Sequence, residues 1–441
     1  MNILFISLGC DKNLVDTEVM LGLLASHGYQ MVEDEMLADI IVINTCCFIH
    51  DAKEESIQTI LEMAEYKKEG RLKALVVTGC LAQRYQQEIL DEIPEVDAIL
   101  GTTSYDKIVD TIQDVLTGHV HVEMADVNAL PVVEENRLVT TGGHYAYLKI
   151  AEGCDKHCTY CIIPTIRGRF RSVPVEQLIK EATMLAGRGV RELILVAQET
   201  TLYGQDLYGK KSLDRLLKEL CKIPDLRWIR ILYCYPEEIT AELIQVIKEE
   251  DKICKYLDLP IQHANNDILK KMGRKTSKEE LEKIIATLRT EIPNITLRTT
   301  LITGFPGETQ AQHEELYEFV DTMEFERLGV FTYSPEEDTP AACMADQIDE
   351  EIKEERQAEL MELQQEIAFE KAEEMIGKEL LVMIEGKVAD ENAYVGRTYK
   401  DAPNVDGLIF VNTQEELLSG DFVKVMVTGA QEYDLIGEIV E

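Results

Sequence analysis

The stretch AEGCDKHCTYC, residues 151–161, places three cysteines on one loop with the spacing C-x3-C-x2-C: Cys154, Cys158 and Cys161. Three thiolates can bind three irons of a 4Fe-4S cluster and leave the fourth iron without a protein ligand. S-adenosylmethionine can chelate that iron through its amino and carboxylate groups, and its reductive cleavage gives a 5′-deoxyadenosyl radical. A zinc ribbon is the alternative, but it needs paired C-x2-C knuckles, and no second knuckle follows.

The sequence around this loop alternates between apolar runs and amphipathic stretches with helical spacing, which is typical of β/α units. Six units over about 190 residues are too few for a closed eight-stranded barrel of about 250 residues. We therefore predict an open, three-quarter barrel over residues 143–345. Its predicted strands are Tyr145–Ala151, Glu192–Ala197, Trp228–Tyr233, Tyr256–Pro260, Thr296–Thr303 and Arg327–Tyr333.

Residues 1–118 contain three apolar runs, Asn2–Leu8, Asp39–Asn44 and Lys73–Thr78, separated by amphipathic stretches. This pattern predicts a βαβαβ domain with a parallel sheet. Each run ends within two residues of a cysteine: Cys10, Cys46 and Cys80. Because the carboxyl ends of parallel strands share one edge, these thiols should converge there and hold a second cluster with an open iron. Scattered buried thiols are the alternative, and Cys47 could replace Cys46.

The remaining segments complete an α/β multidomain protein. Residues 119–142 show no sustained period and are predicted to form a connector, and residues 346–376 an acidic linker helix packed by one apolar stripe. Five short strands separated by turn residues follow over 377–441, which indicates a small β-barrel of OB-like type.

The bulk composition limits the environment and the partners. None of the apolar runs in the 441 residues approaches the roughly 18 needed to span a bilayer, and the first residues lack the basic start of a signal peptide. We therefore expect a cytoplasmic protein with no membrane contact, in which a count of eleven cysteines indicates metal binding or catalysis by some of them. A net charge of −38 makes stable nucleic-acid binding unfavourable and suits a basic protein partner.

Six phrases along the chain resemble the radical S-adenosylmethionine methylthiotransferase family. They are SLGCDKNLVDTE (7–18), INTCCFIHDAKEES (43–56), VTGCLAQRY (77–85), AEGCDKHCTYCIIPTIRGRFRS (151–172), YLDLPIQHANNDILKKMGR (256–274) and LRTTLITGFPGET (297–309). The resemblance implies a cluster domain, a radical barrel and a C-terminal TRAM domain. It also implies two 4Fe-4S clusters: an auxiliary one on Cys10, Cys46 and Cys80 that presents sulfur, and a radical one on the C-x3-C-x2-C loop. The clusters and S-adenosylmethionine then supply the chemistry, with no catalytic side chain.

Smaller features resemble the RimO branch of this family. Lys12 in GCDKN and the segment GRTYKDAPNVDG (396–407) are similar to that branch, whereas the tRNA-modifying MiaB branch favours GCQMN. The resemblance implies a transferase that methylthiolates the β-carbon of an aspartate in small-subunit ribosomal protein twelve. The alternatives are a tRNA (adenosine) methylthiotransferase of MiaB type and a non-catalytic iron–sulfur or zinc scaffold.

The charge of the TRAM segment favours the protein substrate independently. Residues 377–441 contain five Lys/Arg against thirteen Asp/Glu, whereas a barrel that binds tRNA should be basic. We therefore expect Asp401 and Asp406 to contact a basic ribosomal loop.

The resemblance also suggests residues that contact the cofactor. Tyr160 precedes the last loop cysteine, and Gln198-Glu199 stands where the family usually has Gln-Asp near the bound methionine. Ile302 and Gly304, at the end of the fifth barrel strand, are expected to contact adenine. Cys47 stands where glycine is usual. An electron donor such as flavodoxin or ferredoxin is the expected redox partner.

Overall fold

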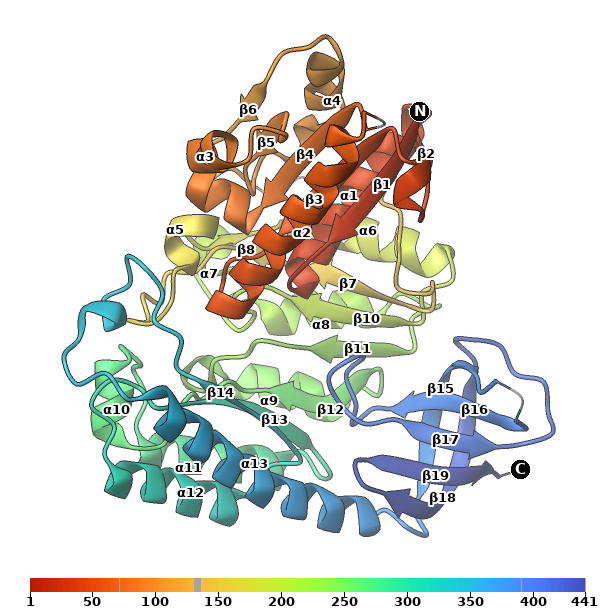
Figure 1. The fold of residues 1–441 in the computed structure, drawn as a ribbon. Coiled ribbons are helices and arrows are strands. Elements are labelled where there is room, and N and C mark those ends of the chain that lie inside the picture. The colour runs from red at the N-terminus through yellow and green to blue at the C-terminus, as the bar shows by residue number, and fades with distance from the viewer. Residues whose placement is uncertain (71, 131–135, 390, 441) are drawn as a thin grey trace.

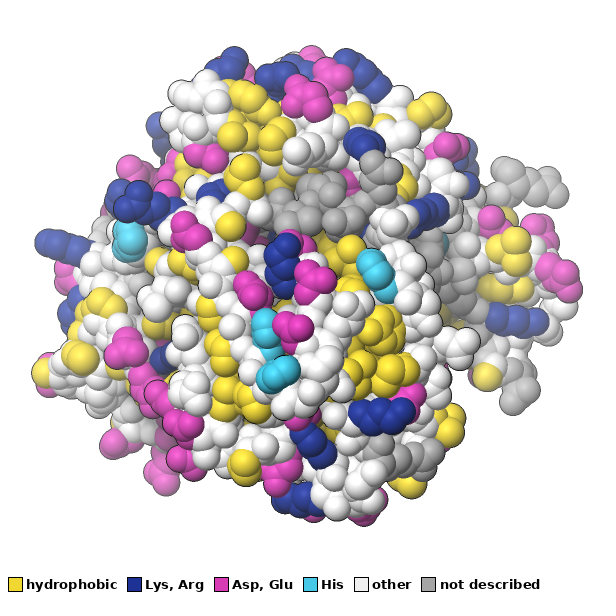
Figure 2. Space-filling model, turned by 90° about the horizontal axis from the view of Figure 1, so that it is seen from above, with side chains coloured by type: hydrophobic (Ala, Val, Ile, Leu, Met, Phe, Trp, Pro, Cys, Tyr) yellow, Lys and Arg dark blue, Asp and Glu magenta, His cyan; other side chains and the backbone are white. Residues whose placement is uncertain are grey.

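The structure is a computed structural model that describes residues 1–440 except 71, 131–135 and 390. A cluster domain, a large open barrel and a small closed barrel follow one another along the chain (Figure 1). In the described residues, no helix is both long and apolar enough to cross a bilayer. Figure 2 shows the molecule from above the view of Figure 1. On this face, acidic side chains are interspersed with Lys and Arg.

The cluster domain contains a six-stranded parallel sheet in the order β2-β1-β3-β4-β5-β6. Its central strands are buried on both faces, which explains their continuous apolar sequence. Helices α2 and α3 cover one face, and α1 and α4 cover the other. The strands are β1 (Asn2–Ser7), β2 (Gln30–Met31), β3 (Ile40–Thr45), β4 (Ala74–Gly79), β5 (Ala98–Leu100) and β6 (His121–Glu123); the helices are α1 (Asp11–Ser26), α2 (His50–Lys68), α3 (Cys80–Glu92) and α4 (Ile108–Leu116).

The three strands predicted in this domain form β1, β3 and β4, so the predicted parallel sheet is confirmed. The sheet extends further than expected, because β2, β5 and β6 also pair with it. These strands have two or three residues each, which is too short for a period to show in the sequence. Strand β6 lies inside the stretch predicted as a connector.

The central domain is an open barrel of six parallel strands in the order β14-β13-β12-β11-β10-β7, as the sequence predicts. Apolar faces of the helices between the strands pack on the outside of the sheet and form the largest core of the molecule. The strands are β7 (Tyr145–Lys149), β10 (Glu192–Val196), β11 (Trp228–Ile231), β12 (Ile253–Asp258), β13 (Thr296–Thr303) and β14 (Arg327–Thr332); the long helices are α6 (Val175–Gly187), α8 (Leu213–Cys221), α9 (Ala241–Glu249), α11 (Lys278–Glu291) and α12 (Gln310–Met323).

Shorter elements of the central domain lie in its loops. A two-stranded ribbon of β8 (Ala151–Glu152) and β9 (Arg171–Ser172) encloses the cysteine loop. The short helices are α5 (Ile163–Arg167), α7 (Gln205–Tyr208) and α10 (Asn266–Lys271).

The acidic helix α13 (Glu350–Glu373) packs against β14 and α12. Leu360, Leu363 and Ile367 on its apolar stripe are part of the barrel core. Farther along, Phe369 meets Tyr433 of the small barrel edge to face, with ring centroids 5.3 Å apart. The helix therefore extends the outer layer of the large barrel as well as connecting it to the small one.

The C-terminal domain is a closed barrel in the order β15-β16-β17-β19-β18, which confirms the predicted small β-barrel. Closure leaves no free strand edge among these five strands. They are β15 (Glu379–Lys387), β16 (Ala393–Thr398), β17 (Ile409–Asn412), β18 (Phe422–Gln431) and β19 (Asp434–Ile439).

A buried ion cluster fixes the small barrel to the large one. Glu192, at the start of β10, accepts hydrogen bonds from Arg230 Nε and Arg397 Nη2, both at 2.7 Å. Burial alone would raise the pKa of Glu192, but Arg397 and Arg230 hold that pKa below its ordinary value. Trp228 of β11 and Phe422 of β18 pack edge to face beside this cluster, with centroids 4.8 Å apart. The small barrel thus closes the end of the large barrel where its strands begin.

We predict that Glu192→Gln destabilises the chain by about 3–5 kcal/mol, because it leaves two buried guanidinium groups without a counter-charge. Chemical denaturation monitored by circular dichroism measures the loss. The matched control is Glu176→Gln, since Glu176 is a glutamate near the start of α6 in the same domain but has a side chain that is 75% exposed. Equal stabilities of the two variants would contradict this role for Glu192.

Candidate active site

The first cysteine triad lies at one edge of the N-terminal sheet. In the register of the adjacent strands β1, β3 and β4, Ser7 pairs with Asn44 and Asn44 with Thr78. Cys10, Cys46 and Cys80 follow these strands. Gly9 allows the first two to approach, because a side-chain Cβ at Gly9 would lie 2.8 Å from Cys46 Cβ, and its φ is +89°.

Of the two adjacent cysteines, Cys46 is the one directed toward the other strand ends. Its Sγ lies 3.1 Å from the Cβ position that a side chain at Gly9 would occupy. Ser56 Oγ donates to the Cys46 carbonyl at 2.9 Å and accepts from its N–H at 3.0 Å, which fixes the backbone. Cys47 is fully buried in the apolar core of the cluster domain. The geometry therefore favours Cys46 as the member of the triad.

The chemistry of these thiols suits an iron–sulfur cluster. Burial raises the pKa of Cys46 to about 12, and the nearby Cys80 and Cys10 raise it as well. Thiolates at this edge therefore require a bound cation, which iron supplies. Among the described residues, no three His, Cys, Asp or Glu side chains are close enough to hold a single metal ion. Three thiols form an all-sulfur donor set, which is the kind that a 4Fe-4S cluster uses, with each ligand on a different iron.

The second triad lies on the loop after β8, which the barrel holds in place. Gly153 has φ +80°, and a Cβ there would lie 2.1 Å from the Arg169 carbonyl oxygen, so only glycine fits. Thr159 donates from its N–H to Met272 O at 2.9 Å and from its hydroxyl to Lys271 O at 2.8 Å. Cys154 borders a cavity of about 310 Å³.

Several buried polar atoms near this loop lack a hydrogen-bond partner in the structure: Gln198 Oε1, Glu199 Oε2, Arg274 Nε and Arg274 Nη1. Burial raises the pKa of Glu199 to about 7, while Lys156 Nζ lies 3.3 Å from its Oε2 and opposes this shift. Both acceptors and donors thus remain available to a polar, zwitterionic ligand such as S-adenosylmethionine. Arg274 was not singled out from the sequence, although it ends one of the six family phrases.

Packing within the protein explains the residue type at three other positions that were expected to contact the cofactor. Tyr160 and Ile302 pack against one apolar cluster that includes Met272 and Phe305. At Gly304, with φ +70°, a Cβ would lie 2.3 Å from Lys353 Cγ, so α13 excludes a side chain. Contacts of these residues with adenine stay predictions.

The structure corrects the expectation that Asp401 and Asp406 face the substrate. Asp401 is 3% exposed, and its carboxylate accepts from Arg327 Nη2 at 2.5 Å and from Thr398 Oγ1 at 2.6 Å. Asp406 has a 1% exposed side chain and accepts from Tyr256 Oη at 2.7 Å. Both aspartates hold the small barrel on the large one and are not accessible to a ribosomal loop. No local pattern indicates their partners Arg327 and Tyr256, which lie on strands of the large barrel that are distant in sequence.

A buried charge network links Cys80 of the first triad to residues that flank the loop of the second triad. Arg167, in α5 after the cysteine loop, donates from Nη2 to Cys80 Sγ at 3.4 Å and from Nη1 to Asp16 at 2.8 Å. Lys149 donates to Asp16 and, at 2.8 Å, to Glu152 Oε2. Gln198 Nε2 in turn donates to Glu152 Oε1 at 2.6 Å. Sequence reasoning missed this network, because charged residues so far apart in the chain show no common pattern.

One short segment after β11 lies beside both triads. Tyr233 Oη donates to Asp11 Oδ2 at 3.0 Å, next to Cys10. Two residues later, Tyr235 Oη lies 3.6 Å from Cys158 Sγ. Since only one residue separates these two tyrosines, this segment borders both triads at the carboxyl ends of the barrel strands.

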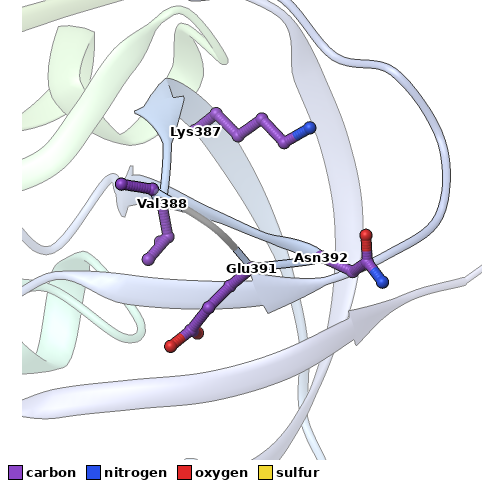
Figure 3. A pocket seen from close by; sticks show the side chains of 5 residues that line it. Lys387, Val388, Glu391 and Asn392 are labelled. Carbon is purple, nitrogen blue, oxygen red and sulfur yellow. The ribbon is translucent and has the colours of Figure 1, made fainter.

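A larger hollow of about 420 Å³ lies elsewhere, at the turn between β15 and β16 (Figure 3). It is lined by residues of that single turn, among them Lys387, Glu391 and Asn392. Its lining contains no cysteine and no residue of the charge network, so we do not assign it a role.

An open parallel barrel with a C-x3-C-x2-C loop at the carboxyl ends of its strands is the arrangement of radical S-adenosylmethionine enzymes. Consistent with this class, residues 148–320 match the radical SAM superfamily. Residues 2–101 match the uncharacterized protein family UPF0004, and residues 376–440 match the TRAM domain.

Curated relatives match over nearly the whole chain. Ribosomal protein uS12 methylthiotransferase RimO of Lachnoclostridium phytofermentans is 67% identical over 437 residues, covering 99% of both chains. The protein of the same name from Clostridioides difficile is 51% identical and covers 98% of both chains. The chain therefore belongs to the RimO family of methylthiotransferases. It is a transferase whose cofactors are S-adenosylmethionine and 4Fe-4S clusters.

Two solved structures share the fold at low sequence identity. The radical S-adenosylmethionine methyltransferase TsrM from Kitasatospora setae is 13% identical with a TM-score of 0.55, covering 77% of this chain and 76% of that chain. The cobalamin-dependent radical enzyme OxsB is 13% identical with a TM-score of 0.53, covering 82% of this chain and 56% of that chain. These likenesses concern the fold alone.

We predict about eight irons per chain after anaerobic reconstitution, and about half after joint replacement of either triad by alanine. Cys46→Ala should lower the iron content and abolish methylthiolation. Cys47→Gly, its matched neighbour, should leave both nearly intact, since Cys47 faces the apolar core. Iron analysis and product mass spectrometry measure these effects. The opposite result for the two cysteines would shift the ligand by one residue.

Proposed function

We propose that this chain methylthiolates the β-carbon of an aspartate in ribosomal protein uS12. In this proposal, Cys10, Cys46 and Cys80 hold the auxiliary cluster that presents sulfur, and Cys154, Cys158 and Cys161 hold the radical cluster. The observation that carries it is the Tyr233–Tyr235 segment, which lies beside both triads. In this proposal, the substrate carbon lies next to this segment, between the groups bound by the two triads.

The bound cofactors supply the radical that takes the hydrogen atom of the C–H bond and the methylthio group that replaces it. The chain's own residues position these groups. Asn13 Nδ2 donates to Thr45 O at 2.9 Å and to Leu8 O at 3.1 Å, which fixes the strand ends that lead to Cys10 and Cys46. Arg167 places a positive charge beside Cys80. Gln198 offers an amide oxygen without a hydrogen-bond partner to the amino group of S-adenosylmethionine. Glu199 offers a carboxylate that also contacts Lys156.

The charge distribution favours a protein substrate over tRNA. Arg397, one of the five basic residues of the TRAM segment, is 1% exposed and paired with Glu192 and Glu385. Acidic and basic side chains are interspersed on the face in Figure 2. The proposal places the chain in the cytoplasm and includes a low-potential electron donor such as flavodoxin or ferredoxin.

The experiment supplies reconstituted enzyme with S-adenosylmethionine, sulfide and reductant, and offers uS12 and an adenosine-containing tRNA stem-loop in one reaction. Mass spectrometry should find one methylthio group on an aspartate of uS12 and none on the RNA. Modification of the RNA with unmodified uS12 would overturn the substrate assignment and leave the radical chemistry in place.

A further inference from the structure

Lys12, the second residue of α1, has a mostly buried side chain whose ammonium group has no counter-charge. The residue is 6% exposed, and its Nζ lies 3.3 Å from the centroid of the Tyr233 ring. In the described part of the chain, its ammonium group makes no hydrogen bond or ion pair. Buried charges are normally paired, and an aromatic face compensates only part of the lost hydration. Lys12 therefore retains donors for a partner that the chain does not supply.

The surroundings of Lys12 identify the place where that partner would bind. Lys12 follows Cys10 by two residues, and Cys10 is exposed. The carboxylate of Asp11 is directed to the Tyr233 hydroxyl. The nearby acidic residues Asp16 and Glu152 are already paired with Lys149 and Arg167. The ammonium thus lies between the edge of the first triad and the Tyr233–Tyr235 segment.

A second feature at the same place also favours an anion. Helix α1 begins at Asp11 with Cys10 at the N-cap, and no side chain caps it. The first N–H groups of a helix lack intrahelical acceptors and carry partial positive charge. A carboxylate that contacts Lys12 Nζ would also experience this field.

We infer that Lys12 binds the side-chain carboxylate of the substrate aspartate and so positions its β-carbon between the two triads. This inference rests on the proposed function. The β-carbon is bonded directly to the carboxylate carbon. Binding of the carboxylate by Lys12 therefore also restricts the position of the reacting carbon. Lys12 would also contribute to the choice of substrate, because an adenine ring is neutral and offers this cation no counter-charge.

The test compares wild-type enzyme and Lys12→Met on two uS12 substrates, one with the native aspartate and one with asparagine in its place. For wild type, asparagine should weaken substrate binding and kcat/KM by roughly tenfold to a hundredfold, the usual effect of losing a charge-assisted hydrogen bond. Lys12→Met should show a similar loss on the native substrate and little further loss on asparagine, since both changes remove the same interaction. Lys12→Arg should restore part of the binding.

The matched control is Lys53→Met, since Lys53 also lies over a tyrosine ring of the cluster domain, that of Tyr85, with Nζ 5.9 Å from the centroid. It should keep the wild-type preference for aspartate. Iron content and substrate-free cleavage of S-adenosylmethionine should stay unchanged in Lys12→Met.

Three results would overturn the inference. The first is equal binding of the aspartate and asparagine substrates by wild-type enzyme, a measurement that needs no variant to fold. The second is loss of auxiliary-cluster iron in Lys12→Met, which would mean that Lys12 balances the charge of the cluster. The third is full additivity of the losses from Lys12→Met and from the asparagine substrate, which would mean that the two groups do not interact. Failure of the proposed function looks different, because wild-type enzyme would then leave uS12 unmodified.

Discussion

The buried pairing of Arg167 with Asp16 and Glu152 is the constraint on which the relation between the two cysteine triads depends. Asp16 belongs to the cluster domain, whereas Arg167, Glu152 and Lys149 belong to the barrel. Removing one partner from such a cluster leaves an uncompensated buried charge, which costs about 3–5 kcal/mol. The domains can therefore pack stably only where these charges meet, and that position brings Arg167 against Cys80.

Helix α1, which contains Asp16, makes a second ionic contact with the rest of the chain. Arg137 donates to Glu18 of α1 at 2.8 and 2.5 Å and to Glu181 of α6 at 2.7 Å. Its guanidinium is fully buried. Between Cys10 and Glu18, the sequence thus supplies a candidate cluster ligand, the lysine proposed to bind substrate, and two carboxylates that fix the domain contact. With these contacts to the rest of the chain, α1 is buried over nearly its whole length.

The order of elements could be predicted from sequence, because each signal is local. The apolar runs predict where the strands before Cys10, Cys46 and Cys80 end. Parallel pairing of these strands then places the three cysteines at one edge of the sheet. Partners that are distant in sequence could not be predicted. Asp401 looked like an exposed loop residue, yet its partner Arg327 lies 74 positions away and buries it. Arg167 likewise gave no local signal for its contact with Cys80.

The central claim is that the two triads open onto one shared space, and paramagnetic coupling between the reduced clusters tests it most directly. The measurement is the electron spin relaxation of the radical cluster in reconstituted wild type and in the variant lacking Cys10, Cys46 and Cys80. Two paramagnets in one cavity relax each other, so we predict faster relaxation of the radical cluster in wild type than in the variant. Identical relaxation in the two proteins, with both clusters of wild type reduced, would contradict the account.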